Sequence, residues 1–319
     1  MSKPRLLFSA PFSFLKNDIE QFNEFFEIDF IEIWKRSEFL ALDKDYEFWI
    51  PNPGQNFVID NSILENMKYL KVISTPSTGT NHIKLVDCES RKVNVKGLLD
   101  QKTKLQSISA SAEFTFLKIL SSLRNIRLAW KEVELNRWRE NEDQMRGYEI
   151  NEKTFGLIGM GRIGNKLCKY LDAFEANKIF FCDPNIDCDE LNIAEKKDLD
   201  FIFKHSDVIV ICCALNEDTQ SMISKKHLDL MLDDSFLINT SRGEIINERE
   251  LVEFLEQRQD IKFSADVITG EVNDLQMQNP LIPFHFEQKI NLTPHIAGAT
   301  YGSQTKAAVF AFEALIEHV

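Results

Sequence analysis

The chain has 319 residues, of which 44% are hydrophobic and 27% charged, and its formal net charge is −13. This length suits two domains better than one. The acidic balance argues against nucleic acid and anionic membrane surfaces as main partners, because both require a basic face. No run of about 18 apolar residues occurs, and the first residues lack the long apolar core of a secretory signal peptide. We therefore expect a cytoplasmic protein without a membrane anchor.

The first hundred residues alternate between short apolar runs and helix-like patterns. This alternation predicts a small α/β unit. The expected strands are 5–9, 46–50, 70–74 and 93–98, and the expected helices are 14–26 and 82–92. Turn-rich stretches follow several strands, and loops after strands are where ligands bind in such layers.

A long helical pattern covers residues 109–135. Its predicted buried face consists of Ala112, Phe116, Ile119, Leu120 and Leu123. The charged stretch that follows, 136–147, is interpreted either as solvated surface or as dimer-contact surface, and solvated surface is preferred.

Three glycines follow the apolar run 154–158. Gly159, Gly161 and Gly164 form a G-x-G-x-x-G at the head of a helical pattern, 162–174. A strand before and a helix after are the context that a dinucleotide-binding turn requires. Gly159 permits a tight turn, Gly161 lets the backbone approach a pyrophosphate, and Gly164 lets the helix pack on the sheet. The helix N-terminus then faces the phosphate charge.

Asp183 ends the next apolar run, about 20 residues beyond the last glycine. A carboxylate at this distance accepts hydrogen bonds from the adenosine ribose and repels a 2′-phosphate. No Lys or Arg between residues 184 and 195 compensates for its charge. The pattern therefore predicts NAD as cofactor in preference to NADP.

Apolar runs recur at regular spacing from this point, beginning near residues 154, 178, 207, 235, 262 and 289. With helical patterns between several of them, they predict a doubly wound parallel sheet of six strands. In this topology strands one and four are neighbours, and ligands bind beyond the carboxyl ends of the strands. A last amphipathic helix, with Ala308, Ala311, Phe312 and Leu315 on one face, is expected to return to the first domain.

Arg242, Glu271 and His295 follow the last three predicted strands. Reduction of a 2-oxo acid places negative charge on the carbonyl oxygen, so it requires a proton donor and a fixed positive charge. His295 can donate the proton, Glu271 would stabilise the imidazolium, and Arg242 would bind the substrate's carboxylate and oxo group. Singly, each has an ordinary alternative as a surface ion pair, a loop carboxylate or a turn histidine. Jointly, in a sheet that binds NAD, they predict a catalytic triad.

These motifs resemble the D-isomer-specific 2-hydroxyacid dehydrogenase family. The similar stretches are 156–164, 213–219, 238–251, 265–271 and 293–300, with 77–82 similar to the family's substrate loop. The resemblance implies an NAD-dependent oxidoreductase that interconverts a D-2-hydroxy acid and its 2-oxo acid, with His295 as the acid/base. It also implies a homodimer of two Rossmann-like domains in each chain. The NAD-binding domain would span 101–297, and a smaller, discontinuous, flavodoxin-like substrate domain would comprise 1–100 and 298–319.

The resemblance further implies the contacts with cofactor and substrate. The implied cofactor contacts are Gly159, Gly161, Arg162, Ile163, Gly164, Asp183, Cys213, Ala214, Thr219, Thr240 and Asp266. Asp266 would meet the nicotinamide carboxamide. Backbone N–H groups around Thr78 and Gly79, together with Arg242, would hold the substrate carboxylate.

The chain departs from the family pattern at Ala214 and Val272, where proline is common. Both changes affect loop stiffness more than chemistry. The chain ends soon after its last helix, so no additional regulatory domain is expected. The six cysteines show no spacing that suits a metal, and we interpret most of them as buried thiols and expect no metal site.

The identity of the acid stays open at this point. No Lys or Arg occurs in 51–57 or 75–82, which disfavours a phosphorylated substrate, and Phe12 and Trp49 suggest a small or apolar side chain. Two alternative functions also stay open. One is an NADH-sensing corepressor or binding module on the same fold. The other is a phosphite-type dehydrogenase, for which the resemblance leads us to expect a lysine at Thr78.

Overall fold

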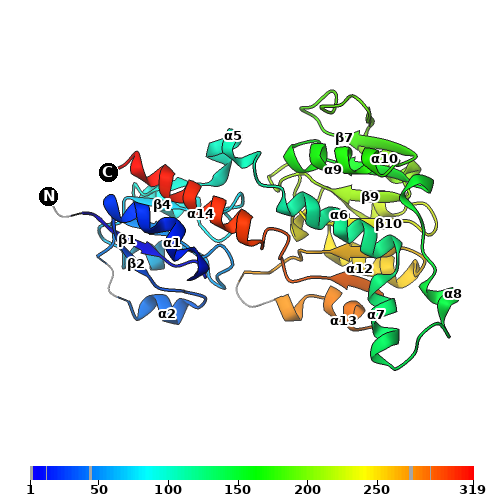
Figure 1. Cartoon of the computed structure of the whole chain (residues 1–319), viewed down its shortest axis with the longest axis horizontal. Helices are drawn as coiled ribbons and strands as arrows, with labels where there is room; N and C mark the ends of the chain where they lie inside the picture. Colours follow the sequence, from blue (N-terminus) through cyan, green and yellow to red (C-terminus); the bar gives the residue numbers. More distant parts are fainter. Residues whose placement is uncertain (1–2, 12, 43–44, 273–275, 288) are drawn as a thin grey trace. The chain divides into compact units, whose positions relative to one another are not determined.

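A computed structural model describes residues 3–11, 13–42, 45–272, 276–287 and 289–319 of the chain. The chain divides into two compact units (Figure 1). Unit 1 comprises Met1–Ile108, Glu271–Leu275 and Ala299–Val319, and unit 2 comprises Ser109–Gly270 and Gln276–Gly298. Phe12, which we associated with the substrate, lies outside the described residues.

Unit 1 contains a parallel sheet of five short strands in the order β2-β1-β3-β4-β5, which is the flavodoxin-like order. The strands are β1 Arg5–Phe8, β2 Glu27–Phe30, β3 Phe48–Ile50, β4 Val72–Ser74 and β5 Asn94–Lys96. Strand β2 was not predicted, because an edge strand with exposed Glu27 and Phe30 gives no apolar run. The predicted α/β class is confirmed.

Both faces of this sheet are covered, because successive strand residues point to opposite sides. Leu6 and Phe8 pack with Phe312 on one face, whereas Leu7 packs with Trp49 on the other. Phe312 belongs to α14, Tyr301–Ile316, so the last helix joins the core of unit 1.

The helices of unit 1 are short. They are α1 Lys16–Ile19, α2 Arg36–Leu40, α3 Asn61–Leu64, α4 Leu85–Ser90 and α5 Lys102–Leu105, with 3₁₀ helices at Ser13–Leu15, Glu20–Glu24 and Leu98–Gln101. The single helix predicted for 14–26 is thus three short pieces. Leu15, Ile19, Phe22 and Phe26 are nevertheless buried, because a spacing of three to four residues marks one face of α and 3₁₀ turns alike.

Unit 2 contains a parallel sheet in the order β12-β11-β10-β9-β6-β7-β8. Its strands are β6 Thr154–Ile158, β7 Lys178–Cys182, β8 Glu195–Lys196, β9 Val208–Ile211, β10 Phe236–Asn239, β11 Lys262–Ala265 and β12 Ile290–Leu292. The sheet has seven strands and not the predicted six, because β8 is a two-residue charged edge strand beside β7. Counting β8 as third makes β9 the fourth strand and the neighbour of β6, where we had predicted the strand at 235.

Helices cover both faces of the second sheet as well (Figure 1). Phe155 and Leu157 of β6 pack with Leu167 on one face, and Ile158 packs with Ile202 on the other. The helices are α6 Ala110–Leu123, α7 Ile126–Glu134, α8 Glu142–Met145, α9 Arg162–Ala173, α10 Leu199–His205, α11 Lys225–Leu228, α12 Glu248–Gln257 and α13 Leu281–Phe286, with 3₁₀ helices at Ile150–Glu152, Gly243–Ile245 and Gln276–Gln278.

The helix predicted for 109–135 is divided into α6 and α7 at Asn125. This residue has a left-handed φ of 49°, and its Nδ2 donates a hydrogen bond to Arg146 O at 2.8 Å. Asparagine tolerates this conformation better than most residues, because its side chain bonds locally.

The buried face of α6 differs in detail from the prediction. Phe116 and Leu120 are only half-buried, whereas Thr115 and Lys118 are buried among the apolar residues. A buried lysine ammonium group is costly unless neighbouring groups compensate its charge.

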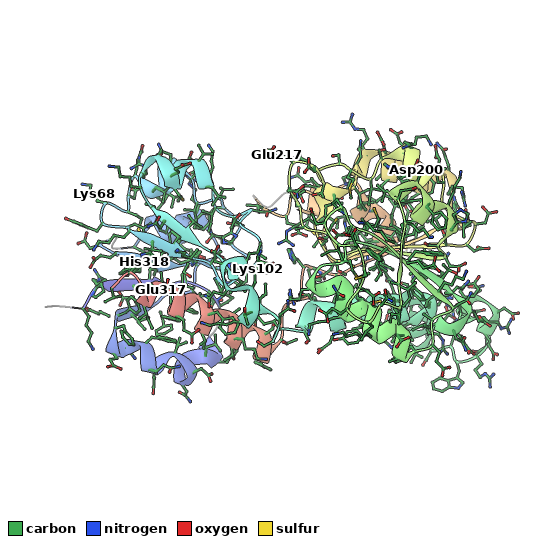
Figure 2. All side chains as sticks on the ribbon, turned by 90° about the horizontal axis from the view of Figure 1, so that it is seen from above. Lys68, Lys102, Asp200, Glu217, Glu317 and His318 are labelled. Carbon is green, nitrogen blue, oxygen red and sulfur yellow. The ribbon has the colours of Figure 1, made fainter. Side chains whose placement is uncertain are left out.

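Charged side chains extend from the surface of both units, as Lys68, Lys102 and Glu317 of unit 1 and Glu217 of unit 2 illustrate (Figure 2). Within the described ranges, no helix has the length and apolar character needed to cross a membrane.

Candidate active site

The predicted dinucleotide turn joins β6 to α9. Gly159 has a left-handed φ of +100°, and a methyl group there would lie 2.7 Å from the backbone nitrogen of Cys213. A methyl group at Gly164 would lie 2.3 Å from the carbonyl oxygen of Gly159, so only glycine lets helix and turn pack this closely. At Gly161 a methyl group would meet no atom of the described chain within 4 Å. The turn is thus open at the position where a pyrophosphate needs room.

Asp183 follows β7 and is tied to this turn. Its Oδ2 accepts a hydrogen bond from the Met160 N–H at 2.8 Å, and its Oδ1 accepts one from the Asn185 N–H at 2.8 Å. Each carboxylate oxygen has a further lone pair, which fits the ribose hydroxyls of a dinucleotide. Arg162 and Ile163 begin α9, and burial lowers the pKa of the Arg162 guanidinium.

The loop after β9 carries three predicted cofactor residues. Thr219 Oγ1 donates to Ala214 O at 2.7 Å and accepts from the Asn216 N–H at 2.8 Å, so this hydroxyl closes the loop. Burial raises the pKa of the Cys213 thiol to about 11, and the Cys213 carbonyl accepts a hydrogen bond from Ser241 Oγ. A thiol of this kind is a poor nucleophile at neutral pH, so Cys213 serves packing.

The loop after β10 contains Thr240 and Arg242. Thr240 is buried, and its Oγ1 lies 2.6 Å from Thr115 Oγ1 on α6. Arg242 is half-buried; its Nη1 donates to Ser241 O at 2.6 Å, and its carbonyl accepts from Asn239 Nδ2 at 2.9 Å. These bonds fix the backbone of Arg242 directly beyond the strand end.

The segment that leads to Glu271 is fastened by Glu248, the first residue of α12. Glu248 Oε1 accepts a hydrogen bond from the Thr269 N–H at 2.6 Å, and its Oε2 accepts one from Asn279 Nδ2 at 2.6 Å. Asn279 Nδ2 also donates to Thr269 O at 3.0 Å. Burial raises the pKa of the Glu248 carboxyl. Glu271 itself is half-buried, two residues beyond this fastening.

Asp266, just after β11, holds the loop that carries His295. Its carboxylate is fully buried; Oδ1 accepts from Thr293 Oγ1 at 2.6 Å and from the Ile296 N–H at 3.1 Å, and Oδ2 accepts from the Ala297 N–H at 2.7 Å. The Asp266 carbonyl accepts the His295 N–H at 2.8 Å. His295 is exposed and has a left-handed φ of 53°, a costly conformation that these bonds enforce.

The loops after β10, β11 and β12 meet at one edge of the sheet. A methyl group at Gly243 would lie 2.2 Å from the carbonyl carbon of Ile268, which brings the first two loops into contact. The hydrogen bonds between Asp266 and residues 293–297 join the second loop to the third. Arg242 and His295 therefore project from adjoining loops of one unit.

The predicted substrate loop lies in unit 1, after β4. His82 Nε2 lies 3.0 Å from Thr75 Oγ1, which lies 3.0 Å from Ser77 Oγ, and Ser77 Oγ donates to Gly79 O at 2.6 Å. Thr75 and His82 are buried, whereas Thr78 and Gly79 are half-buried.

Trp49 lies on β3 of unit 1, where its side chain is fully buried and its Nε1 donates to Ser9 Oγ at 2.9 Å. Its predicted influence on the substrate side chain is therefore wrong at the level of direct contact.

Lys118, Glu248 and Asn279 were not identified from the sequence, although they hold the site's strands and loops. The signal for Lys118 is a lysine at the spacing of an apolar helix face. Glu248 and Asn279 gave no such signal, because they bond to each other and to backbone groups of a distant loop.

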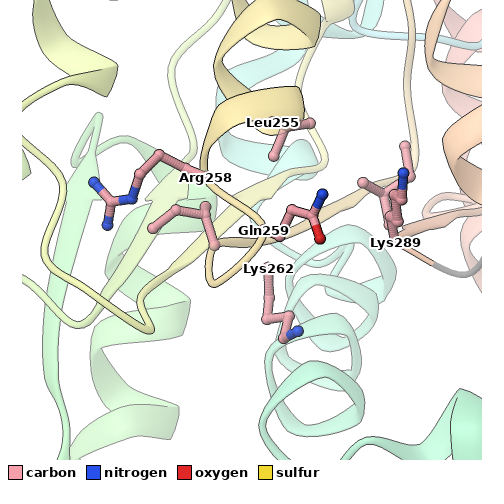
Figure 3. A pocket seen from close by; sticks show the side chains of 7 residues that line it. Leu255, Arg258, Gln259, Lys262 and Lys289 are labelled. Carbon is pink, nitrogen blue, oxygen red and sulfur yellow. The ribbon is translucent and has the colours of Figure 1, made fainter.

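A hollow of about 180 Å³ lies at the opposite edge of the same sheet (Figure 3). It is lined by Leu255, Arg258, Gln259, Ile261, Lys262, Lys289 and Ile290, around the amino ends of β11 and β12. Figure 3 shows the Arg258 guanidinium pointing away from Lys289. The basic groups thus do not converge, and we place the dinucleotide site at the glycine turn instead.

The chain is similar to known proteins in both sequence and fold. A family model described as D-isomer specific 2-hydroxyacid dehydrogenase, NAD binding domain, matches residues 116–297. A glyoxylate reductase of Thermofilum pendens is 33% identical over 266 residues, which cover 81% of this chain and 74% of that protein. A glyoxylate reductase/hydroxypyruvate reductase of Mus musculus is 28% identical over 77% of this chain and 73% of its own length.

Solved structures agree in fold. The apo-structure of D-lactate dehydrogenase from Escherichia coli superimposes with a TM-score of 0.81 at 21% identity, covering 98% of this chain and 97% of the other. D-Lactate dehydrogenase from Aquifex aeolicus, complexed with NAD and lactic acid, superimposes with a TM-score of 0.76 at 23% identity, covering 98% and 94%.

The chain belongs to the D-isomer specific 2-hydroxyacid dehydrogenase family. It is an oxidoreductase that uses NAD and interconverts a 2-hydroxy acid of D configuration with the corresponding 2-oxo acid. The relatives favour this function over the binding module and the phosphite-type dehydrogenase that the sequence left open.

Proposed function

We propose that the chain reduces a small, unphosphorylated 2-oxo acid, glyoxylate foremost, with His295 as the proton donor. The observation that carries this proposal is the fastening of the His295 loop by Asp266, which holds an exposed imidazole in one backbone conformation. Glyoxylate is named because several relatives are glyoxylate reductases. The loop 75–82 contains no Lys or Arg for a phosphate group.

Unit 2 is proposed as the NAD-binding domain and unit 1 as the substrate domain. Bound NADH supplies the hydride for the carbonyl carbon of the substrate. The open turn at Gly161 would hold the pyrophosphate together with Arg162 and Ile163, and Asp183 would bind the ribose. The loops with Cys213, Ala214, Thr219, Thr240 and Asp266 would complete the cofactor site.

Residues of the chain itself would supply the proton and stabilise the charges that develop during the reaction. His295 would donate a proton to the carbonyl oxygen as negative charge develops there. Arg242, which carries a permanent charge at the end of β10, would bind the substrate carboxylate and stabilise that oxygen. Glu271 would stabilise the imidazolium form of His295, and its loop is held at Thr269 by Glu248.

Thr78 and Gly79 are proposed to bind the substrate carboxylate through their backbone N–H groups. Within the described part of the chain, these two N–H groups donate no hydrogen bond. The Ser77 hydroxyl fixes the loop by donating to Gly79 O. Successive backbone N–H groups in such a turn form a site for an anion.

The test is an NADH-oxidation screen with glyoxylate, pyruvate, hydroxypyruvate, phenylpyruvate and branched-chain 2-oxo acids, each repeated with NADPH. We expect kcat/KM to be largest for a small unphosphorylated acid and larger with NADH than with NADPH. A protein that oxidises NADH with none of these acids would contradict the proposed reduction. Equal kcat/KM for the two cofactors would contradict the role of Asp183.

A homodimer in the cytoplasm completes the proposal. Helix α7 and the segment after it expose Trp130 at 69%, Val133 at 54% and Trp138 at 73%, which is unusual for a solvated surface. The family resemblance implies a dimer, and a second copy would cover this face. Light scattering after size-exclusion chromatography tests this, and a Trp130→Ser, Trp138→Ser double variant should shift the mass toward one chain.

A further inference from the structure

Lys118 of α6 has no part in the proposed cofactor or substrate contacts, yet it lies in the core of unit 2. The residue is 6% exposed, and its Nζ donates a hydrogen bond to Asn291 O at 3.1 Å. Burial lowers the pKa of Lys118 to about 8, the charge of Asp266 opposes this shift, and Arg127 adds to it. A buried lysine costs stability, and such residues are concentrated at functional sites.

The strand that Lys118 binds is the outermost strand of the sheet and leads directly to His295. Arg127 of α7 donates to Ile290 O at 2.5 Å and to His285 O at 2.6 Å, and the Leu292 N–H donates to His285 Nδ1 at 3.0 Å. Together with Lys118 at Asn291, side chains thus bind three consecutive residues of β12. These bonds satisfy backbone groups of an edge strand that α6, α7 and α13 cover.

We propose that Lys118 is a positioning residue for His295. Its ammonium group binds β12 and interacts with the charge of Asp266, and both β12 and Asp266 fix the loop 293–297. The cation offsets the carboxylate that accepts the Ile296 and Ala297 N–H groups. The proposal rests on the proposed role of His295 in proton transfer.

Three charged or titratable groups face Lys118 from the neighbouring elements: Asp266 after β11, Arg127 on α7 and His285 on α13. Arg127 is committed to the carbonyls of Ile290 and His285. His285 Nδ1 accepts a backbone N–H and therefore carries no proton, and burial lowers the pKa of His285. Lys118 is thus the cation of this cluster whose charge changes at moderately alkaline pH.

The first experiment measures amide hydrogen exchange of the unliganded protein at pH 7, resolved at Ile296 and Ala297. The variants are Lys118→Met, Lys118→Arg and, as a matched control, Lys204→Met, which removes an exposed lysine of α10. We expect exchange about 10-fold faster in Lys118→Met, because the acceptor loses its cation, and near-wild-type exchange in the other two. Unchanged exchange in Lys118→Met overturns the proposal. This readout needs no substrate, so it decides the role of Lys118 even if the proposed reduction fails.

The second experiment follows kcat from pH 6 to 10 for oxidation by NAD of the 2-hydroxy acid whose 2-oxo partner is reduced fastest in the screen. In the wild type we expect kcat to fall above about pH 8 as Lys118 becomes neutral. Lys118→Arg should keep its activity above pH 8, since arginine stays charged. Lys118→Met should be slower than the wild type below about pH 8 and approach its rate toward pH 10, while its melting temperature at pH 7 rises. Loss of packing alone would lower the melting temperature. Profiles of the same shape in all three proteins would overturn the proposal.

Discussion

Two loops carry the proposed chemistry. Charged groups hold one of them in place, and uncharged groups hold the other. The loop 293–297 of unit 2 is held by a buried carboxylate, Asp266, with the cation Lys118 close enough to interact with it. The loop 75–82 of unit 1 is held by the hydroxyls of Thr75 and Ser77 and by the buried imidazole of His82.

The difference follows from what each loop has to bind. Hydrogen bonds to a charged group are shorter and stronger than neutral ones, so they suit a loop that must hold a proton donor in one geometry. A buried carboxylate beneath the other loop would repel the carboxylate of the substrate. Hydroxyl groups order that loop without this penalty.

The largest effect is expected for His295, which projects from the loop 293–297. His295→Ala should lower kcat by about a thousandfold, because it removes the proton donor, while the Kd for NADH changes only a few-fold. Steady-state kinetics and NADH fluorescence titration on the same preparation measure both quantities. Loss of NADH binding together with turnover would show that His295 is structural.

The second-largest effect is expected for Asp266, whose carboxylate accepts the hydrogen bonds that hold the loop 293–297. Asp266→Asn places an amide N–H₂ against donors of residues 293–297, and the loss of stability should be about 3 to 5 kcal/mol. Urea unfolding of unliganded protein measures it, with Asp200→Asn on the surface of unit 2 as control. A loss below about 1 kcal/mol would mean that the carboxylate is not the fastening.

Lys118 makes the stability of unit 2 depend on pH. Its pKa is about 8 in the folded chain and near the ordinary 10.5 in the unfolded chain, so the unfolded chain binds the proton more tightly between these values. Stability from this group therefore rises as pH rises from 8 to 10.5, and Lys118→Met should be more stable than wild type at pH 7 by about 2 kcal/mol. Thermal unfolding across this range checks both statements. A difference between the two proteins that does not shrink above pH 8 would contradict the assignment.

The smallest effect is expected for the hydroxyl groups that hold the loop 75–82. Ser77→Ala removes one hydrogen bond to Gly79 O, worth about 1 kcal/mol, so KM for the 2-oxo acid should rise about fivefold with kcat nearly unchanged. Ser90→Ala, which removes an exposed hydroxyl of α4, is the matched control. A fall in kcat at constant KM would mean that Ser77 affects the chemical step. That result would contradict the proposed difference between the two loops.

The fold followed from the sequence wherever strands are buried on both faces. The apolar runs that recur from residue 154 onward predicted the parallel sheet, and the glycines after the first run predicted the turn. Strands β2 and β8 were missed, because an edge strand with exposed or charged residues carries no apolar signal. Missing β8 also shifted the count of strands, so the neighbour of β6 was predicted wrongly.

The positions of Arg242, Glu271 and His295 were predicted from their places after strands, and their catalytic roles stay predictions. The supporting residues were beyond the reach of sequence patterns. Asp266 acts through three donors in a loop near residue 295, and Lys118 acts through a carbonyl of β12. Such contacts link positions far apart in the chain and repeat at no fixed spacing.

The most direct test of the central claim is the fate of deuterium in a reaction with glyoxylate or pyruvate and NADH deuterated at its transferable position. For the product formed from pyruvate, mass spectrometry identifies the labelled carbon and chiral chromatography identifies its configuration. We predict deuterium at C2 of D-lactate with the wild type and about a thousandfold less labelled product in the same time with His295→Ala. Unlabelled product, or label in the L enantiomer, would contradict the account.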